Sequence, residues 1–202
     1  TMMVCLALLA SASPALAAES LCRGTPARGR IEHAVQLPAR GKNFRAYSAV
    51  GLGLGRTYTH GRVADAVTDA YASLARQAPA KTFVYGETGF AKGGPFKPHK
   101  THQNGLSVDF MVPVIDAKGR SVPLPTHAGN RYGYDIEFDA DARYCDLRID
   151  FEALGQHLYA LDQASRRSGS RIDRAIFEPA FLPRLFATTR GAYLRKDRKS
   201  VV

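Results

Sequence analysis

Two histidines and an aspartate stand close together near the middle of the chain. His99 and His102 are three residues apart in a polar segment, and Asp109 follows seven residues after His102. Imidazole nitrogens and carboxylate oxygens are donors that zinc binds at about 2.0–2.2 Å. Asp109 lies between Val108 and Phe110, and burying a carboxylate is costly unless a partner compensates its charge. This spacing favours a metal site, although solvated loop histidines and a buried salt bridge at Asp109 would also account for these residues.

The flanking sequence predicts a strand for the aspartate and a loop for the histidines. Residues 106–114 alternate and are mostly β-forming, which is typical of a strand, and residues 82–86 predict a second strand. A loop rich in Gly, Pro and Lys covers residues 89–100. Gly105 allows the backbone to turn from this loop into the strand. We therefore expect the histidine loop and the aspartate strand to converge on one point.

The remaining elements predict an α+β domain. Apolar residues recur at helical spacing over 63–77 and again over 151–162, where Asp150 is the expected N-cap. Residues 171–177 predict a third strand, and residues 179–194 predict an amphipathic helix. This mixture indicates helices packed on a small, mostly antiparallel sheet.

Composition limits the class of protein. The chain has 202 residues, 45% of them hydrophobic, which predicts one folded domain and excludes a mostly disordered chain. It contains no run of eighteen apolar residues, so no transmembrane anchor is expected. The net charge of +10 favours an anionic partner, and nucleic acid, a membrane surface and an acidic cell-wall polymer all qualify.

The N-terminal sequence predicts export. Residues 3–10 are a short apolar run, and small residues at Ala15 and Ala17 match a signal-peptidase site, so we expect a signal peptide over 1–17; the alternative is a buried N-terminal helix. After cleavage two cysteines remain, Cys22 and Cys145. In an exported protein these two can form a disulfide bond, or they can stay as unpaired thiols.

The segment 102–109, His-Gln-Asn-Gly-Leu-Ser-Val-Asp, resembles the His-x6-Asp signature of zinc peptidoglycan metallopeptidases. That group includes lysostaphin-type enzymes, D-Ala-D-Ala carboxypeptidases and the hedgehog fold. With His99 included, the pattern is similar to the penicillin-insensitive murein endopeptidases. The segments 44–48 and 55–60 are also similar to this family in residue type, and the resemblance covers roughly residues 22–194.

The resemblance implies a hedgehog-like or D-Ala-D-Ala-peptidase-like fold and a periplasmic zinc peptidase that cuts the peptide cross-links of peptidoglycan. His102 and Asp109 would be zinc ligands, and His99 would be a ligand or would lie just behind the ligands. A murein- or metal-binding domain without catalysis is the main alternative. A metal-dependent nuclease is less favoured, because Lys and Arg are scattered rather than gathered in a stripe, and nucleic acid is not an expected partner.

The chain departs from the family pattern after the motif. The family's third zinc ligand and general base come from a C-terminal His-x-His element, and this chain has no histidine after His157. We interpret His157 as a core or surface residue of its helix and His127 as a loop residue that could line the cleft. Glu87 could be a second carboxylate behind the site, but we favour a residue of a surface turn.

The missing element leads to an expectation about the C-terminus. We expect the endopeptidase domain to cover residues 18–196 with its C-terminal part missing, and residues 197–202 to be an artefactual tail. On that interpretation the chain would be inactive as truncated, and no general base is identified in it.

Overall fold

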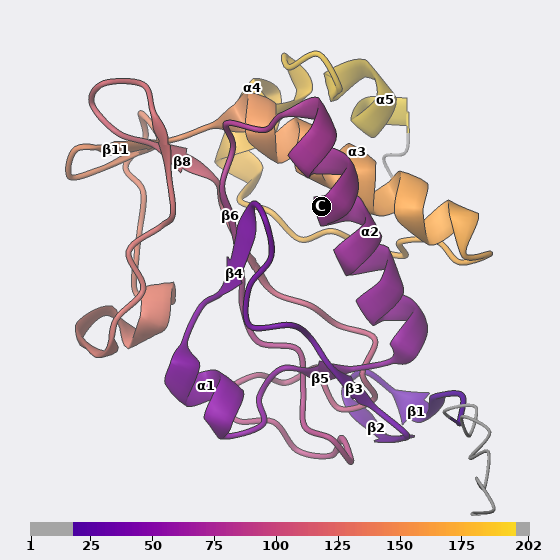
Figure 1. Ribbon diagram of the computed structural model, residues 1–202. Helices are drawn as coiled ribbons and strands as arrows, with labels where there is room; N and C mark the ends of the chain where they lie inside the picture. The colour runs from indigo at the N-terminus through magenta and orange to yellow at the C-terminus, as the bar shows by residue number, and fades with distance from the viewer. Residues whose placement is uncertain (1–17, 197–202) are drawn as a thin grey trace, which may run out of the picture.

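The structure is a computed structural model that describes residues 18–196 (Figure 1). The predicted signal peptide and the C-terminal tail lie outside the described residues. The helices are α1 (Ala49–Gly53), α2 (Gly61–Gln77), α3 (Phe151–Arg167), α4 (Leu182–Phe186) and α5 (Gly191–Lys196), with 3-10 helices at Ala128–Gly133 and Pro179–Phe181. The strands are β1 (Leu21–Thr25), β2 (Arg28–Glu32), β3 (Val35–Gln36), β4 (Phe44–Ala46), β5 (Tyr58–Thr59), β6 (Phe83–Tyr85), β7 (Phe110–Met111), β8 (Val114–Ile115), β9 (Ser121–Val122), β10 (Arg143–Tyr144) and β11 (Leu147–Ile149).

The strands form four small sheets rather than one. Their orders are β1-β2, β3-β5, β4-β6-β7 and β10-β11-β8-β9. Among the described strands only β4 and β6 pair in parallel, and every other pair is antiparallel. The prediction of an α+β protein with mostly antiparallel pairing is therefore confirmed.

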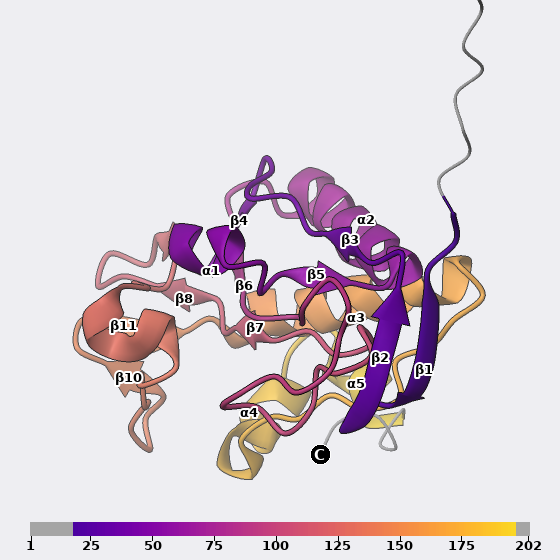
Figure 2. The same cartoon turned by 90° about the horizontal axis from the view of Figure 1, so that it is seen from below.

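The two long helices form where the apolar periodicity predicts them. In α2, Val67, Tyr71 and Leu74 are buried at steps of three and four residues, so one face of the helix enters the core. The side chain of Asp150 accepts a hydrogen bond of 3.0 Å from the backbone of Ala153, which caps the start of α3. The two helices lie side by side and cover one face of the β4-β6-β7 sheet (Figures 1 and 2).

Alternation along β6 divides the core in two. Phe83 and Tyr85 pack against α2 and α3, whereas Val84 faces a second cluster that contains Met111. Val84 is the register partner of Met111, and Tyr85 is the partner of Phe110. Side chains on successive strand residues point to opposite faces. Continuing this register by one residue places position 86 opposite Asp109, both on the face of the second cluster.

The predicted strand over 106–114 is too long. Only Phe110–Met111 pairs with β6, and Val114–Ile115 belongs to a different sheet. Pro113 lies between the two strands, and proline has no N–H to donate to a ladder. Asp109 just precedes β7, but its N–H still donates to the carbonyl of Glu87 at 2.9 Å. The backbone of Asp109 is therefore hydrogen-bonded to the segment that follows β6, although Asp109 itself lies just outside β7.

Two C-terminal predictions are wrong. Residues 171–177 form an irregular connection, in which Phe177 packs on the C-terminal helices and Ile176 is 84% exposed. The predicted helix over 179–194 is broken into a 3-10 turn, α4 and α5. At the break the chain folds back so tightly that a Cβ on Gly191 would stand 2.0 Å from the carbonyl oxygen of Phe186. The short helices α4 and α5 pack on α3, and this packing accounts for the conformation of both segments.

The disulfide between Cys22 and Cys145 is not formed. Both cysteines are free and exposed. Cys22 belongs to β1, whereas Cys145 lies in the turn between β10 and β11, and these two hairpins stand at opposite ends of the molecule in both views (Figures 1 and 2). The distance between the hairpins is the reason that the two thiols stay apart. No helix within residues 18–196 is both long and apolar enough to cross a membrane.

His157 is a core residue, as we interpreted it. Its ring lies 5.1 Å from that of Tyr71, 4.9 Å from that of Phe83 and 4.8 Å from that of Phe110. Its Nε2 has no hydrogen-bond partner among the described residues. Burial disfavours the charged imidazolium and lowers the pKa of His157 to about 3.

We expect this buried imidazole to make the fold sensitive to acid. The unfolded chain binds the proton near pH 6.5, whereas folded His157 does not bind it until about pH 3, so stability is lost as the pH falls through this window. The loss at pH 5 relative to pH 7 is about 2 kcal/mol. Urea unfolding at both pH values should show a shallower pH dependence in His157→Leu. An equal pH dependence of the unfolding free energy in wild type and His157→Leu would contradict the assignment of this acid sensitivity to His157.

Candidate metal centre

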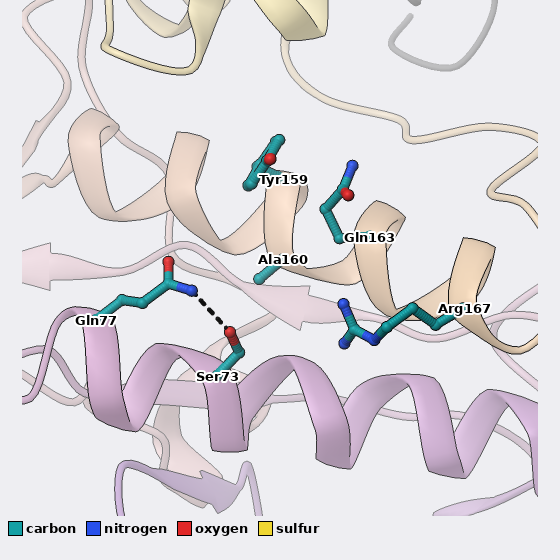
Figure 3. A pocket seen from close by; sticks show the side chains of 6 residues that line it. All are labelled: Ser73, Gln77, Tyr159, Ala160, Gln163 and Arg167. Atoms are coloured by element: carbon teal, nitrogen blue, oxygen red, sulfur yellow. Dashed lines mark hydrogen bonds between the residues drawn. The ribbon is translucent and has the colours of Figure 1, made fainter.

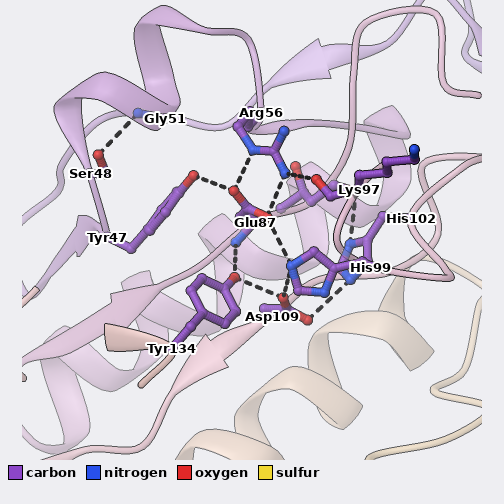
Figure 4. A network of polar contacts seen from close by, with 11 residues as sticks. Tyr47, Ser48, Gly51, Arg56, Glu87, Lys97, His99, His102, Asp109 and Tyr134 are labelled. Atoms are coloured by element: carbon purple, nitrogen blue, oxygen red, sulfur yellow. Dashed lines mark hydrogen bonds and ion pairs between the residues drawn. The ribbon is translucent and has the colours of Figure 1, made fainter. Parts of the chain in front are cut away.

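The structure brings together the three residues with metal-ligand spacing (Figure 4). His99 and His102 come from the loop after β6, and Asp109 immediately precedes β7. One donor atom from each lies within 4.8 Å of the others. The Nε2 atom of His102 is 3.1 Å from Oδ1 of Asp109, and Nε2 of His99 is 3.7 Å from Oδ2. Two imidazoles and one carboxylate thus point at a common position.

His102 is oriented by its backbone and by the strand beside it. Its φ of 71° lies in the left-handed region, and its side chain is 3% exposed. The Nδ1 atom is 3.2 Å from the carbonyl oxygen of Thr88, which assigns the ring proton to Nδ1. The lone pair of Nε2 then faces a carboxylate oxygen of Asp109. Two electron-pair donors in contact are what a cation between them would stabilise, so the donor set fits a bound metal ion.

Gly105 makes the predicted turn between the loop and the strand. Its φ is +76°, and a Cβ at this position would stand 2.5 Å from Cδ1 of Ile31. Glycine is therefore required both by the backbone conformation and by the close packing of β2. The turn brings the side chains of His102 and Asp109 into contact.

Glu87 is part of this cluster, and the prediction of a surface turn residue is wrong. It is 6% exposed, and its Oε2 lies 2.9 Å from Nε2 of His99. Tyr47 donates to Oε1 at 2.7 Å, and Arg56 donates to both carboxylate oxygens. Glu87 follows the buried strand β6 after one residue, Gly86, and its side chain enters the interior instead of a turn at the surface.

Arg56 connects Glu87 to the loop that carries the histidines. Its guanidinium donates to the carbonyl oxygen of Lys97 at 2.8 Å and lies 4.1 Å from the centre of the Phe96 ring. Phe96 is 1% exposed, and its ring centre is 5.8 Å from that of His99 and 5.5 Å from that of His102. This apolar backing excludes water behind the two imidazoles and fixes the loop.

Tyr134 completes the polar network (Figure 4). Its hydroxyl donates to Oδ2 of Asp109 at 2.8 Å and accepts the N–H of Glu87 at 3.0 Å. Sequence reasoning missed Tyr134, because a lone tyrosine in an irregular segment carries no spacing signal. Tyr47 and Arg56 lie inside the segments quoted for the family resemblance, but nothing in their spacing assigned them a role.

Both carboxylates of the cluster are ionised near neutral pH. Burial would raise the pKa of Asp109, but its contact with His102, the hydrogen bond from Tyr134 and the nearby His99 hold it below its usual value. Burial would likewise raise the pKa of Glu87, and hydrogen bonds from Arg56 and Tyr47 together with the arginine charge lower it. The site therefore carries the negative charge that a divalent cation needs.

The other described histidines have structural positions. His60 caps α2 by accepting the N–H of Arg62, and His33 is exposed between β2 and β3. His127 is exposed at the start of the 3-10 helix that begins at Ala128, and no contact joins it to the cluster among the described residues. The suggestion that His127 lines the site stays a prediction.

A hollow between the two long helices lies apart from this cluster (Figure 3). Every residue that lines it belongs to α2 or α3, and none belongs to the metal-ligand group. Its lining residues are Ser73, Gln77, Tyr159, Ala160, Gln163 and Arg167. Gln77 donates to Ser73 at 2.9 Å, so part of this polar lining is satisfied internally.

Comparison with known proteins identifies a family. Residues 22–131, more than half of the chain, match the family described as penicillin-insensitive murein endopeptidase. This segment contains His99, His102, Asp109 and Glu87, and it ends before Tyr134. A comparison with curated proteins finds no match. The chain therefore belongs to the penicillin-insensitive murein endopeptidases, a family of peptidases whose substrate is peptidoglycan.

Proposed function

We propose that the protein is a zinc-dependent murein endopeptidase and that His99, His102 and Asp109 hold the zinc ion. The observation that carries the proposal is the convergence of their three donor atoms within 4.8 Å, inside the segment that matches the family. Imidazole nitrogen and carboxylate oxygen are usual ligands of catalytic zinc, which keeps a position open for water or substrate.

A zinc ion at this position would supply a Lewis acid for the scissile carbonyl and would lower the pKa of a water molecule. The protein supplies the orientation of the ligands. Thr88 holds His102 through its carbonyl oxygen, and Oε2 of Glu87 lies 2.9 Å from Nε2 of His99, the ring nitrogen that also faces Asp109. Phe96 keeps water away from the rear of both rings. The ionised Asp109 contributes a negative charge that favours a cation over an anion at this point.

We expect chelation to stop the reaction and penicillin to leave it unchanged. Incubation with 1,10-phenanthroline should abolish release of monomeric peptides from cross-linked muropeptides, and added zinc should restore it. The isomer 1,7-phenanthroline, which cannot chelate, is the matched control. Penicillin should have no effect, because the proposed mechanism uses no serine nucleophile. An activity that survives chelation or is blocked by penicillin would contradict the proposal.

Zinc-dependent binding of murein without cleavage is the second candidate. The observation that favours it is that Glu87, the carboxylate beside the ligands, is occupied by Arg56, Tyr47 and His99, whereas a general base needs a free oxygen. Sedimentation with purified peptidoglycan, followed by analysis of the released products, distinguishes binding alone from cleavage. Bound protein without new products would support the binding function.

We further propose that residues 18–196 form the endopeptidase domain and that the protein is exported to the periplasm. The substrate supports this location, because peptidoglycan lies outside the cytoplasmic membrane. Cell fractionation with an antibody against the protein tests it. Recovery of the protein only in the cytoplasm would contradict export.

A further inference from the structure

Tyr134 lies where one hydroxyl touches both carboxylate-bearing segments of the site. Its oxygen donates to Oδ2 of Asp109 at 2.8 Å and accepts from the backbone N–H of Glu87 at 3.0 Å. The other oxygen, Oδ1, lies 3.1 Å from Nε2 of His102. The two oxygens of Asp109 therefore have different neighbours: Oδ2 faces Tyr134 and, at 3.7 Å, Nε2 of His99, whereas Oδ1 faces His102.

The sheet leaves a space for this contact. Gly86 stands opposite Asp109 in the ladder, and its N–H donates to the Asp109 carbonyl at 2.7 Å. A Cβ on Gly86 would stand 2.9 Å from the hydroxyl of Tyr134 and 2.9 Å from Cβ of Asp109. Approaches under 3.0 Å are essentially not seen for real Cβ atoms. Any larger residue at position 86 would therefore displace the phenol or the carboxylate.

The backbone before Tyr134 is held in an uncommon conformation. Arg131 and Tyr132 have φ values of 46° and 58°, in the left-handed region that L residues rarely adopt in succession. The side chain of Asn130 stabilises this turn by accepting the N–H groups of His127 and Gly133, each at 3.0 Å. Strained backbone of this kind persists where the surrounding structure enforces it, often at functional sites. Its effect is to direct the side chain of Tyr134 at Oδ2 of Asp109.

We propose that Tyr134 is a positioning residue of the metal site. It holds Oδ2 of Asp109 and thereby fixes the carboxylate in the orientation that directs Oδ1 at His102. This inference rests on the proposed zinc site, and Tyr134 lies beyond the segment that matches the family.

The test compares Tyr134→Phe with Tyr132→Phe. Each variant removes one phenolic oxygen from the same turn, but the hydroxyl of Tyr132 makes no hydrogen bond within residues 18–196, although its ring contacts Tyr47 as that of Tyr134 does. Zinc affinity is measured by competition with a chromophoric chelator, and the site is also loaded with Co²⁺ for its visible absorption spectrum. We expect Tyr134→Phe to weaken zinc binding by about 10–100-fold and to change the Co²⁺ spectrum. Tyr132→Phe should match the wild-type chain in both.

Gly86→Ala provides a second route to the same contact. It leaves Tyr134 and Asp109 chemically intact while its methyl group pushes them apart, and it should also weaken zinc binding. Circular dichroism of the metal-free proteins shows whether each variant folds. Folded Tyr134→Phe with wild-type affinity and spectrum would overturn the positioning role alone. A wild-type chain that binds neither zinc nor Co²⁺ would overturn the zinc site and this role with it.

Discussion

Replacing Asp109 with asparagine should abolish stoichiometric zinc and peptidase activity while the protein remains folded. The substitution keeps the shape of the side chain but removes the charge that faces both imidazoles. Loss of a direct ligand should cost more affinity than the roughly 10–100-fold typical of residues that only support ligands. Metal content after dialysis, measured by mass spectrometry, is the readout that does not depend on activity. His102→Ala should give the same result.

Asp116→Asn is the matched control for this prediction. Asp116 also accepts side-chain hydrogen bonds, from Arg120, but it lies in the turn between β8 and β9, and it is not in the metal-ligand group. We expect this variant to retain zinc. Full zinc occupancy in both Asp109→Asn and His102→Ala would show that the ion is held elsewhere, and the site would have to be reassigned.

Replacing Glu87 with glutamine should produce the largest loss of stability among the site variants. The Glu87 carboxylate is 8% exposed and its partner Arg56 is 18% exposed, so the variant leaves a mostly buried guanidinium without its counter-charge. Removing one partner of a buried ion pair costs about 3–5 kcal/mol, and partial exposure of Arg56 places the expected value near the lower end.

The pH dependence gives an independent check on Glu87. Its folded pKa is held below the ordinary value of 4.5, so the stability that it contributes is present above that value and is lost as the pH falls through the folded pKa. The difference in unfolding free energy between wild type and Glu87→Gln should therefore narrow in acid. Glu32→Gln is the control, because the Glu32–Arg23 pair is exposed on the β1–β2 hairpin and its loss should change stability little. Equal stability of wild type and Glu87→Gln at neutral pH would contradict the role of this network.

Elements whose signals are local could be predicted from the sequence. Helical periodicity depends on residues three and four apart, so α2 and α3 could be predicted from their own segments. His99, His102 and Asp109 also lie within eleven residues of one another in the sequence. Gly105 lies in the same stretch and makes the turn, because its φ of +76° is a conformation that glycine adopts readily. These features could be predicted because a short stretch of chain contains all the residues that produce them.

The residues that support the metal position could not be predicted, because they come together only in the folded chain. Tyr47, Arg56, Glu87 and Tyr134 belong to four separate segments, and ladder pairing and helix packing bring them together. Packing on α3 divided the predicted C-terminal helix, whereas the predicted strand ended at Pro113 for the local reason that proline has no N–H for a ladder. Contacts between distant segments leave no periodicity in the sequence. The ligand spacing is therefore visible in one sequence, whereas the residues that orient the ligands are visible only in the fold.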